Sequence, residues 1–167
     1  MKVISKQRNS KMCVICGMEN PFGLKAQFYN MEDSSVVTPF QFREEHQSYP
    51  QRVHGGLIAA VLDELGLRAC WTQSEQIWGV TLSLEVKYRS PVPYGVTLFG
   101  RGKVEKETSR FVTVDTHILD SEGKVLANAL VKYIKLGIDQ IAENADVHEE
   151  MRYFIEDGIT DLPVKLQ

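Results

Sequence analysis

The central feature of the chain is a run of small and branched apolar residues that follows a pair of glycines. It reads His54-Gly55-Gly56-Leu57-Ile58-Ala59-Ala60-Val61-Leu62-Asp63-Glu64-Leu65-Gly66. This composition predicts a helix from about Gly55 to Trp71 that is buried on nearly all sides. An acid buried without a partner costs several kcal/mol, so we expect the pair Asp63-Glu64 to contain one carboxylate that is satisfied or used in chemistry.

The segments around this helix alternate between apolar and polar residues and predict strands. We expect a hairpin over residues 25–31 and 35–43, and four strands over residues 78–88, 96–106, 110–119 and 124–136. In the first of these four, the alternation predicts one face made of Val80, Leu82, Leu84 and Val86 and an opposite face made of Thr81, Ser83, Glu85 and Lys87. This order predicts the α+β class, with one long helix packed on an antiparallel sheet of five to six strands.

The two ends of the chain differ from this pattern. Residues 1–12 are polar and basic, and we interpret them as an N-terminal arm. Residues 138–167 mix acids with apolar residues at helical spacing, which predicts one or two surface helices and a frayed tail. We therefore expect one domain over residues 1–137 and a C-terminal helical extension over residues 138–167.

Charge and composition narrow the possible partners. The formal net charge is -3 in 167 residues, which disfavours general binding to nucleic acid. No run approaches the roughly 18 apolar residues of a membrane span, and the basic start of the chain has no apolar segment behind it to form a signal peptide. Three cysteines, an odd number, argue against a disulfide scaffold. We expect a cytoplasmic protein with no membrane or nucleic-acid partner.

Two of the cysteines, Cys13 and Cys16, have the spacing of half a zinc site. A structural zinc site needs four ligands, usually from a second such pair, and this sequence has none. Cys70 with a histidine is one way to complete the set. The sequence favours a tight turn with two small, partly buried thiols, and we expect no metal and no cofactor.

Candidate chemistry collects around the predicted helix. Glycines at its start let a ligand approach backbone N–H groups at a helix N-terminus, where negative charge is stabilised. Asp63 follows about two turns later, and an ionisable group in an apolar setting often marks a functional site. Glu64 lies about 100° around the helix and fits a solvated face better. We expect the His54 ring to fix the loop by hydrogen bonding rather than to act as an acid or base.

These motifs together resemble the hotdog-fold acyl-CoA thioesterases of the phenylacetate-pathway (PaaI-like) type. The resemblance covers about residues 13–136. It is carried by His54-Gly55-Gly56 with Asp63 nine residues after the histidine, by the Cys-x-x-Cys-Gly…Asn-Pro-x-Gly-Leu stretch from Cys13 to Leu24, by Gly79-Val80-Thr81, and by Tyr88-Arg89-Ser90-Pro91-Val92. It implies a hotdog fold, hydrolysis of an acyl-CoA to free acid and CoA, and a homodimer or homotetramer. Two helices would lie side by side under a continuous sheet, with active sites shared between subunits.

The resemblance also implies roles for individual residues. The N–H groups of Gly56 and Gly55 would stabilise the oxyanion, and Asp63 would act as general base or as nucleophile. Thr81 of the other subunit would hold the attacking water, and Gln47 would hydrogen-bond the thioester carbonyl. Residues of suitable chemistry for binding CoA are Tyr88, Arg89, Arg110, Lys87 and Lys103. The sequence departs from relatives at Ser48, where some have a catalytic Asn, and at Gln51-Arg52, where many have a glycine.

Two other functions are compatible with the same fold. One is a hydratase or dehydratase acting on acyl thioesters, although those enzymes usually pair a histidine with an acid in a different helix-entry pattern. The other is a non-catalytic module that binds acyl-CoA. Asp63 distinguishes the thioesterase from the binding module, because a binding module needs no buried acid at this point.

Overall fold

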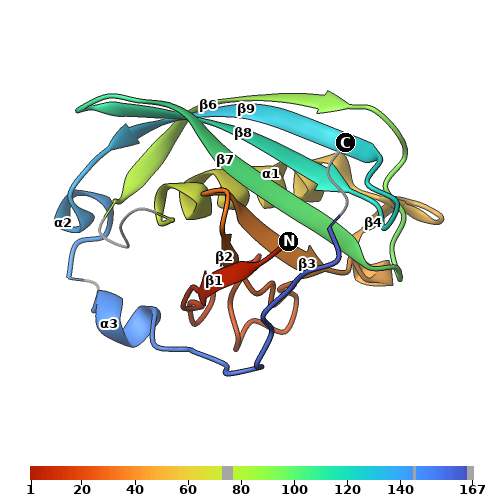
Figure 1. Ribbon diagram of the computed structural model, residues 1–167, viewed down its shortest axis with the longest axis horizontal. Coiled ribbons are helices and arrows are strands. Elements are labelled where there is room, and N and C mark those ends of the chain that lie inside the picture. Colours follow the sequence, from red (N-terminus) through yellow and green to blue (C-terminus); the bar gives the residue numbers. More distant parts are fainter. Residues whose placement is uncertain (73–76, 145, 165–167) are drawn as a thin grey trace.

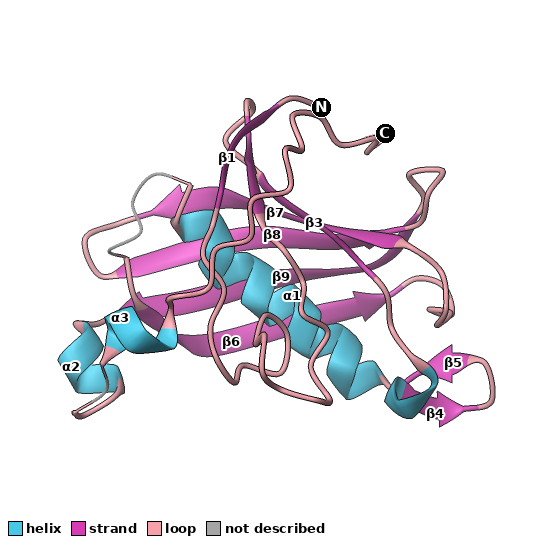
Figure 2. Ribbon diagram, turned by 90° about the horizontal axis from the view of Figure 1, so that it is seen from below, coloured by secondary structure: helices cyan, strands magenta, loops and turns pink. Residues whose placement is uncertain are grey.

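A curved antiparallel sheet wraps around one long helix in the computed structural model (Figures 1 and 2). The structure describes residues 1–72, 77–144 and 146–164. The helix, α1, runs from Gly55 to Cys70. Within the described residues the sheet has seven strands, in the spatial order β1 (Val3–Lys6), β2 (Tyr29–Met31), β3 (Val36–Phe40), β7 (Leu98–Glu107), β8 (Phe111–Leu119), β9 (Val125–Lys135) and β6 (Gly79–Tyr88).

The architecture is the hotdog fold that the sequence predicted, with one more strand than expected. The extra strand is β1, which comes from residues predicted to be an arm and pairs with β2. A separate two-stranded ribbon, β4 (Gln47–Tyr49) and β5 (Arg52–Val53), follows a short 3-10 helix (Glu44–His46) and leads into α1. Figure 2 shows this ribbon beside the N-terminal end of α1. None of the described helices is long and apolar enough to cross a membrane.

Glycines on β7 and on α1 allow the helix backbone to lie very close to the sheet. A Cβ atom on Gly102 would lie 2.6 Å from the carbonyl oxygen of Leu65, and one on Gly100 would lie 2.7 Å from the Leu65 side chain. On α1 itself, a Cβ on Gly66 would lie 2.1 Å from the Tyr133 hydroxyl of β9. The buried apolar face of α1 contributes about 1.5–3 kcal/mol for each large side chain. It is made of Ile58, Val61, Leu62, Leu65 and Ala69.

Strand β6 differs from its predicted face pattern because it contains a bulge. The pairing of β6 with β9 shifts register between Thr81 and Ser83. A one-residue shift moves side chains to the opposite face of a sheet. Thr81 is therefore opposite Tyr133 and faces the helix, whereas Val80 and Leu82 are 42% and 51% exposed. The predicted alternation is wrong before the bulge and agrees with the structure for Leu84 and Val86, which pack against the core.

The C-terminal residues contain two one-turn helices, α2 (Ile138–Ile141) and α3 (Val147–Glu150), and then an extended stretch. This stretch runs beside β1 (Figure 1), with backbone hydrogen bonds from Val3 to Thr160 and from Leu162 to Met1. Leu162 and Val164 are buried in a second, smaller apolar cluster with residues of β2, β3 and β7. The described stretch that follows α3 thus pairs with the sheet edge that β1 forms.

Among the charged groups that the structure describes, the guanidinium of Arg68 on α1 is the most deeply buried, at 2% exposed. Its Nε donates to Glu64 Oε1 at 2.8 Å, and its Nη1 donates to the carbonyl of Arg8 at 2.7 Å. The guanidinium also lies over the rings of Phe28 and Trp71, at 4.7 and 4.6 Å from their centroids. Glu64 was expected on a solvated face. It is instead half-buried in this ion pair, because the N-terminal loop covers that side of the helix.

Replacing Arg68 tests the contribution of this buried pair. We expect Arg68→Met to lower the free energy of unfolding by about 3–5 kcal/mol, because it leaves the half-buried Glu64 without its cation. Lys87, which forms an exposed pair with Glu85, serves as the control: Lys87→Met should cost less than about 1 kcal/mol. Urea denaturation followed by circular dichroism measures both values. Equal stability of Arg68→Met and the unmodified protein would contradict a stabilising role for the pair.

Candidate active site

The start of α1 has one backbone N–H that is capped by a side chain and one that has no described acceptor. His54 is the N-cap residue, and its Nδ1 accepts a hydrogen bond from the Gly56 N–H at 3.0 Å. The His54 carbonyl accepts from the N–H groups of Leu57 and Ile58. Among the described residues, none accepts a hydrogen bond from the Gly55 N–H. The first amide of the helix is therefore the one that is free to bind an anion or a carbonyl oxygen.

A surface groove of about 390 Å³ lies at this helix end. Its lining includes Gly55, Tyr88 and Arg89, three of the residues singled out in the sequence. The Tyr88 hydroxyl donates to the Gly55 carbonyl at 2.9 Å, and Arg89 Nε donates to the side-chain oxygen of Asn128 at 3.0 Å. The first hydrogen bond holds the end of β6 against the start of the helix, and the second orients Arg89 against the neighbouring strand β9. The groove thus combines a free backbone amide with an oriented guanidinium.

Gln47 and Arg110, two further candidates for contacting the substrate, lie in different places. Gln47 is exposed on β4, paired with Val53 of the ribbon that leads into α1. Arg110 precedes β8 at the opposite end of the sheet. On β9, the partners of Tyr88 and Phe111 are seven residues apart, which corresponds to about 23 Å along the strand. Within one chain, Gln47 is therefore near the groove and Arg110 is not.

Asp63 has one carboxylate oxygen held and one free. Its Oδ1 accepts hydrogen bonds from the hydroxyl of Thr81 at 2.8 Å and from that of Tyr133 at 3.1 Å. The Tyr133 hydroxyl also donates to the backbone carbonyl of Asp63 at 2.5 Å. No described residue donates to Oδ2. The two hydroxyls orient the carboxylate and leave Oδ2 as the oxygen available for chemistry.

Thr81 contacts Asp63 of its own chain, whereas the family resemblance implied a threonine from the other subunit. The bulge in β6 is the cause, because it turns Thr81 toward the helix. Within one chain the Thr81 hydroxyl donates directly to the Asp63 carboxylate.

Tyr133 is a residue of this site that the sequence reasoning missed. It is 2% exposed. Burial raises the pKa of its hydroxyl, and the nearby charge of Asp63 raises it further. The hydroxyl therefore stays protonated and remains a donor at neutral pH. The only signal in the sequence is its place on the apolar face of the last strand, two residues after Val131. That signal predicts burial but gives no partner.

The helix end and Asp63 lie on one face of α1 but far apart along it. Seven residues separate Gly56 from Asp63, which corresponds to nearly two full turns and about 10 Å along the axis. A single thioester carbonyl needs both groups within about 3 Å of its reacting atoms. One chain therefore does not bring both groups to the same carbonyl.

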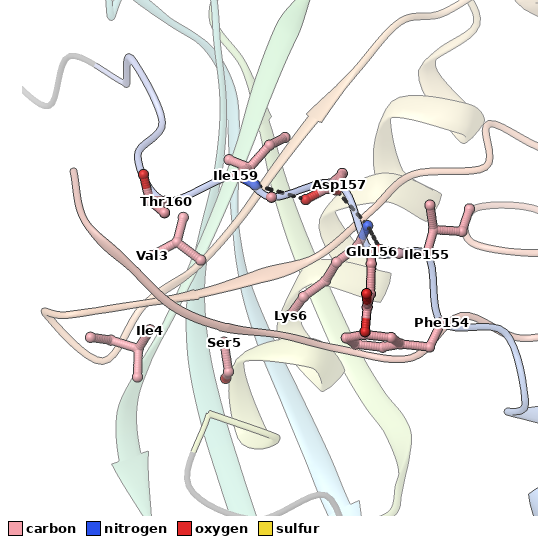
Figure 3. Close-up of a pocket in the computed structure, with 11 residues that line it drawn as sticks. Val3, Ile4, Ser5, Lys6, Phe154, Ile155, Glu156, Asp157, Ile159 and Thr160 are labelled. Atoms are coloured by element: carbon pink, nitrogen blue, oxygen red, sulfur yellow. Dashed lines mark hydrogen bonds and ion pairs between the residues drawn. The ribbon is translucent and has the colours of Figure 1, made fainter.

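A second surface groove, of about 420 Å³, lies away from these residues (Figure 3). It is formed by β1 and the C-terminal stretch from Phe154 to Thr160. Lys6 crosses it to reach Asp157, at 2.5 Å, and Asp157 also accepts a hydrogen bond from Tyr29. These contacts hold the tail on the sheet, and none of the residues that line this groove belongs to the candidate site.

Comparisons with known proteins show which families and folds this chain is similar to. Residues 51–127 match the Thioesterase superfamily model. Acyl-coenzyme A thioesterase THEM4 of Rattus norvegicus is 28% identical over 116 residues, covering 69% of this chain and 49% of that protein, so this chain spans about half its length.

Two solved structures share the fold. The Escherichia coli PaaI protein from the phenylacetic acid degradation operon has a TM-score of 0.62 and 20% identity, covering 68% of this chain and 81% of that one. A hypothetical thioesterase from Streptococcus pneumoniae, solved with coenzyme A, has a TM-score of 0.59 and 20% identity, covering 67% and 86%.

The His54 cap leads to a testable prediction. His54→Ala removes the side-chain acceptor for the Gly56 N–H, and we expect the free energy of unfolding to fall by about 1 kcal/mol. His54→Asn supplies a good N-cap acceptor and should recover most of this loss. Urea denaturation compares the three proteins. If His54→Ala and His54→Asn were equally destabilised, the role of the ring as a helix cap would be wrong.

Proposed function

Because this chain carries the thioesterase superfamily region on a hotdog fold, we propose that it is an acyl-CoA thioesterase. It would hydrolyse an acyl-CoA to the free acid and CoA. The observation that carries the proposal is the carboxylate of Asp63, with Oδ1 held by two hydroxyls and Oδ2 free. The name of the THEM4 relative and the coenzyme A in the Streptococcus pneumoniae structure support an acyl-CoA as the substrate.

Asp63 acts through Oδ2 in either of two ways. As a general base, it removes a proton from a water molecule that attacks the thioester carbonyl carbon. As a nucleophile, it attacks that carbon itself, CoA leaves as the thiolate, and water then hydrolyses the mixed anhydride. In both cases Thr81 and Tyr133 position the carboxylate by binding Oδ1. Both routes release CoA and the free acid.

The carbonyl oxygen gains negative charge during the attack and needs donors at the right place. The Gly55 N–H is free and lines the groove at the helix N-terminus, and it serves as the first donor. The Gly56 N–H becomes a second donor when the His54 side chain rotates away. Removing one oxyanion donor from a hydrolase typically costs about 10²–10³-fold in kcat.

The separation of these groups along α1 favours a site built from two copies of the chain. A twofold axis that passes beside Ala59 and Ala60 would place α1 of one copy antiparallel to α1 of the other. It would bring Asp63 of each copy to the glycines of its partner. Gly56 is exposed, and Ala59, Ala60 and Asp63 are half-buried, so this side of the helix is open in a single chain. We infer a homodimer, or a tetramer of such dimers, with shared sites.

The remaining candidates fit around this centre. Arg89 and Tyr88 line the groove where CoA would bind, and Gln47 on the neighbouring ribbon would hydrogen-bond the thioester. The finer assignment to the phenylacetate-pathway type rests on the His54-Gly55-Gly56 motif, the spacing to Asp63, and the shared fold with PaaI. The odd number of cysteines supports a reducing compartment such as the cytoplasm.

The activity and the role of Asp63 are tested together by thiol release from a panel of acyl-CoAs. We expect Asp63→Asn to lower kcat by at least about 10²-fold, because it removes the base or nucleophile. Thr81→Val, which deletes one orienting hydroxyl, should lower kcat by about tenfold, and Thr81→Ser should restore it. Glu85→Gln, an exposed acid on the outer face of the same strand, should leave kcat unchanged.

Two outcomes would contradict this assignment. Full turnover by Asp63→Asn would mean that the acid is not catalytic. Binding of acyl-CoA by the unmodified protein without thiol release from any substrate would favour a binding module.

Mixed dimers test whether the site is shared. Gly55→Pro removes the free N–H at the first helical position, where proline is well tolerated, and Gly55→Ala keeps the N–H as a control. If each site combines Asp63 from one copy with Gly55 from the other, a mixed Asp63→Asn/Gly55→Pro dimer contains one intact site. Equal mixing of the two variants should restore about a quarter of the original activity. No recovery in dimers that have exchanged subunits would place the whole site within one chain.

A further inference from the structure

Three side chains that can bind a metal meet beside α1, on a different face of the helix from Asp63. They are Cys13 and Cys16 of the N-terminal loop and Glu64 of the helix. Their ligand atoms all lie within 4.8 Å of one another, although 48 residues of sequence separate Cys16 from Glu64. The cluster is distinct from the candidate active site, because Glu64 projects from a different face of the helix than Asp63.

The N-terminal loop directs two backbone N–H groups at the sulfur of Cys13. Cys13 Sγ accepts backbone hydrogen bonds from the N–H groups of Ile15 at 3.3 Å and Cys16 at 3.4 Å. The turn closes with a hydrogen bond from the Gly17 N–H to the Cys13 carbonyl at 2.8 Å. Gly17 is required at this point, because a Cβ there would lie 2.3 Å from that oxygen. N–H groups directed at a sulfur stabilise the thiolate, which is the form that binds metals.

The spacing of the ligand atoms suits zinc. Tetrahedral zinc binds sulfur at about 2.3 Å and carboxylate oxygen at about 2.0–2.2 Å, which separates two such ligands by about 3.6 Å. The observed distance from Cys13 Sγ to Glu64 Oε2 is 3.7 Å. The other carboxylate oxygen, Oε1, is bound to Arg68 and leaves Oε2 directed at the cysteine. Little movement is needed to coordinate an ion between them.

Arg68 balances the charge of such a site. Besides its bond to Glu64, its Nη2 lies 2.8 Å from Cys16 Sγ. Two thiolates, one carboxylate, one divalent cation and one guanidinium sum to zero net charge. A hydrogen-bonded group behind the ligands is the usual way in which proteins orient a metal site. The buried position of Arg68 is thereby explained by the same cluster.

We propose that Cys13, Cys16 and Glu64 bind a zinc ion, with water as the fourth ligand. Soft thiolates select zinc over magnesium or calcium, and the partial exposure of Cys13 leaves an open side for the water. The ion would join the N-terminal loop to α1 at the residue next to Asp63. In the sequence, Cys70 with a histidine was one way to complete the ligand set. Cys70 is instead buried elsewhere on the helix, where burial raises its pKa to about 12 and its thiol bonds the Gly66 carbonyl.

Metal analysis and cobalt titration test the site directly. Protein purified with a reductant and without chelators should contain about one zinc per chain by mass spectrometry of the metal. After removal of zinc, Co²⁺ should bind in equal amount and give a thiolate-to-cobalt charge-transfer band, which reports sulfur ligation in the unmodified protein. Zinc should also raise the melting temperature of the metal-free protein, because it binds only the folded loop.

Matched variants identify the ligands. Cys13→Ser and Glu64→Gln should each weaken Co²⁺ binding by at least about 100-fold, with Glu64→Gln keeping an oxygen for Arg68. Cys70→Ala keeps the cluster and should bind like the unmodified protein. Circular dichroism checks that each variant is folded.

Three results would overturn the proposal. The first is less than about 0.1 Co²⁺ bound per chain in fully reduced protein. The second is a cobalt spectrum without the charge-transfer band. The third is unchanged binding in both folded ligand variants. None of these readouts depends on thioesterase activity, so the zinc site and the proposed function are tested independently.

Discussion

The close contact between α1 and β9 at Gly66 determines the position of the candidate catalytic acid. Because Gly66 has no side chain, the Tyr133 hydroxyl lies directly against the helix and binds both the carbonyl and the carboxylate of Asp63. Gly100 and Gly102 allow the same close approach on β7. An added methyl group at Gly102 would meet the helix backbone and push the helix off the sheet, and one at Gly66 would displace the Tyr133 hydroxyl. The glycines therefore set the distance between the helix and the sheet, and with it the position of the Asp63 side chain.

A β-bulge in the edge strand β6 supplies the second hydroxyl donor to Asp63. A regular strand would direct Thr81 away from the helix and leave Asp63 with one hydroxyl donor. Because of the bulge between Thr81 and Ser83, the Thr81 side chain points toward the helix, while Leu84 and Val86, after the bulge, still pack against the core. The local loss of ladder pairing is thus accompanied by a second hydrogen bond to the carboxylate. Bulges near functional sites commonly redirect a side chain in this way.

The two adjacent acids of the helix have separate surroundings. Asp63 faces hydroxyl groups from the sheet, whereas Glu64 faces the N-terminal loop, where it meets Arg68 and Cys13. A rotation of about 100° per residue is enough to direct the two side chains into different environments. One helix can in this way serve a candidate reaction centre on one side and anchor the start of the chain on the other.

The sequence by itself determined the elements whose signals are local. The helix was predicted from about Gly55 to Trp71 and runs from Gly55 to Cys70, and each of the four later strands was predicted to within two residues at either end. Periodicity and turn residues suffice for this, because they act over a few neighbouring positions. The motif of His54, Gly55, Gly56 and Asp63 also indicated where a candidate site lies.

Only the tertiary structure decided which residues meet. It paired Thr81 and Tyr133 with Asp63, brought Glu64 to Cys13 and Cys16, and added β1 to the sheet. It also separated Arg110 from the groove at the helix start. These relations join segments that are far apart in the chain, and they depend on strand register, a bulge and the packing distance of the helix. The pattern of apolar and polar residues does not determine any of these three features, because each depends on contacts between distant parts of the chain.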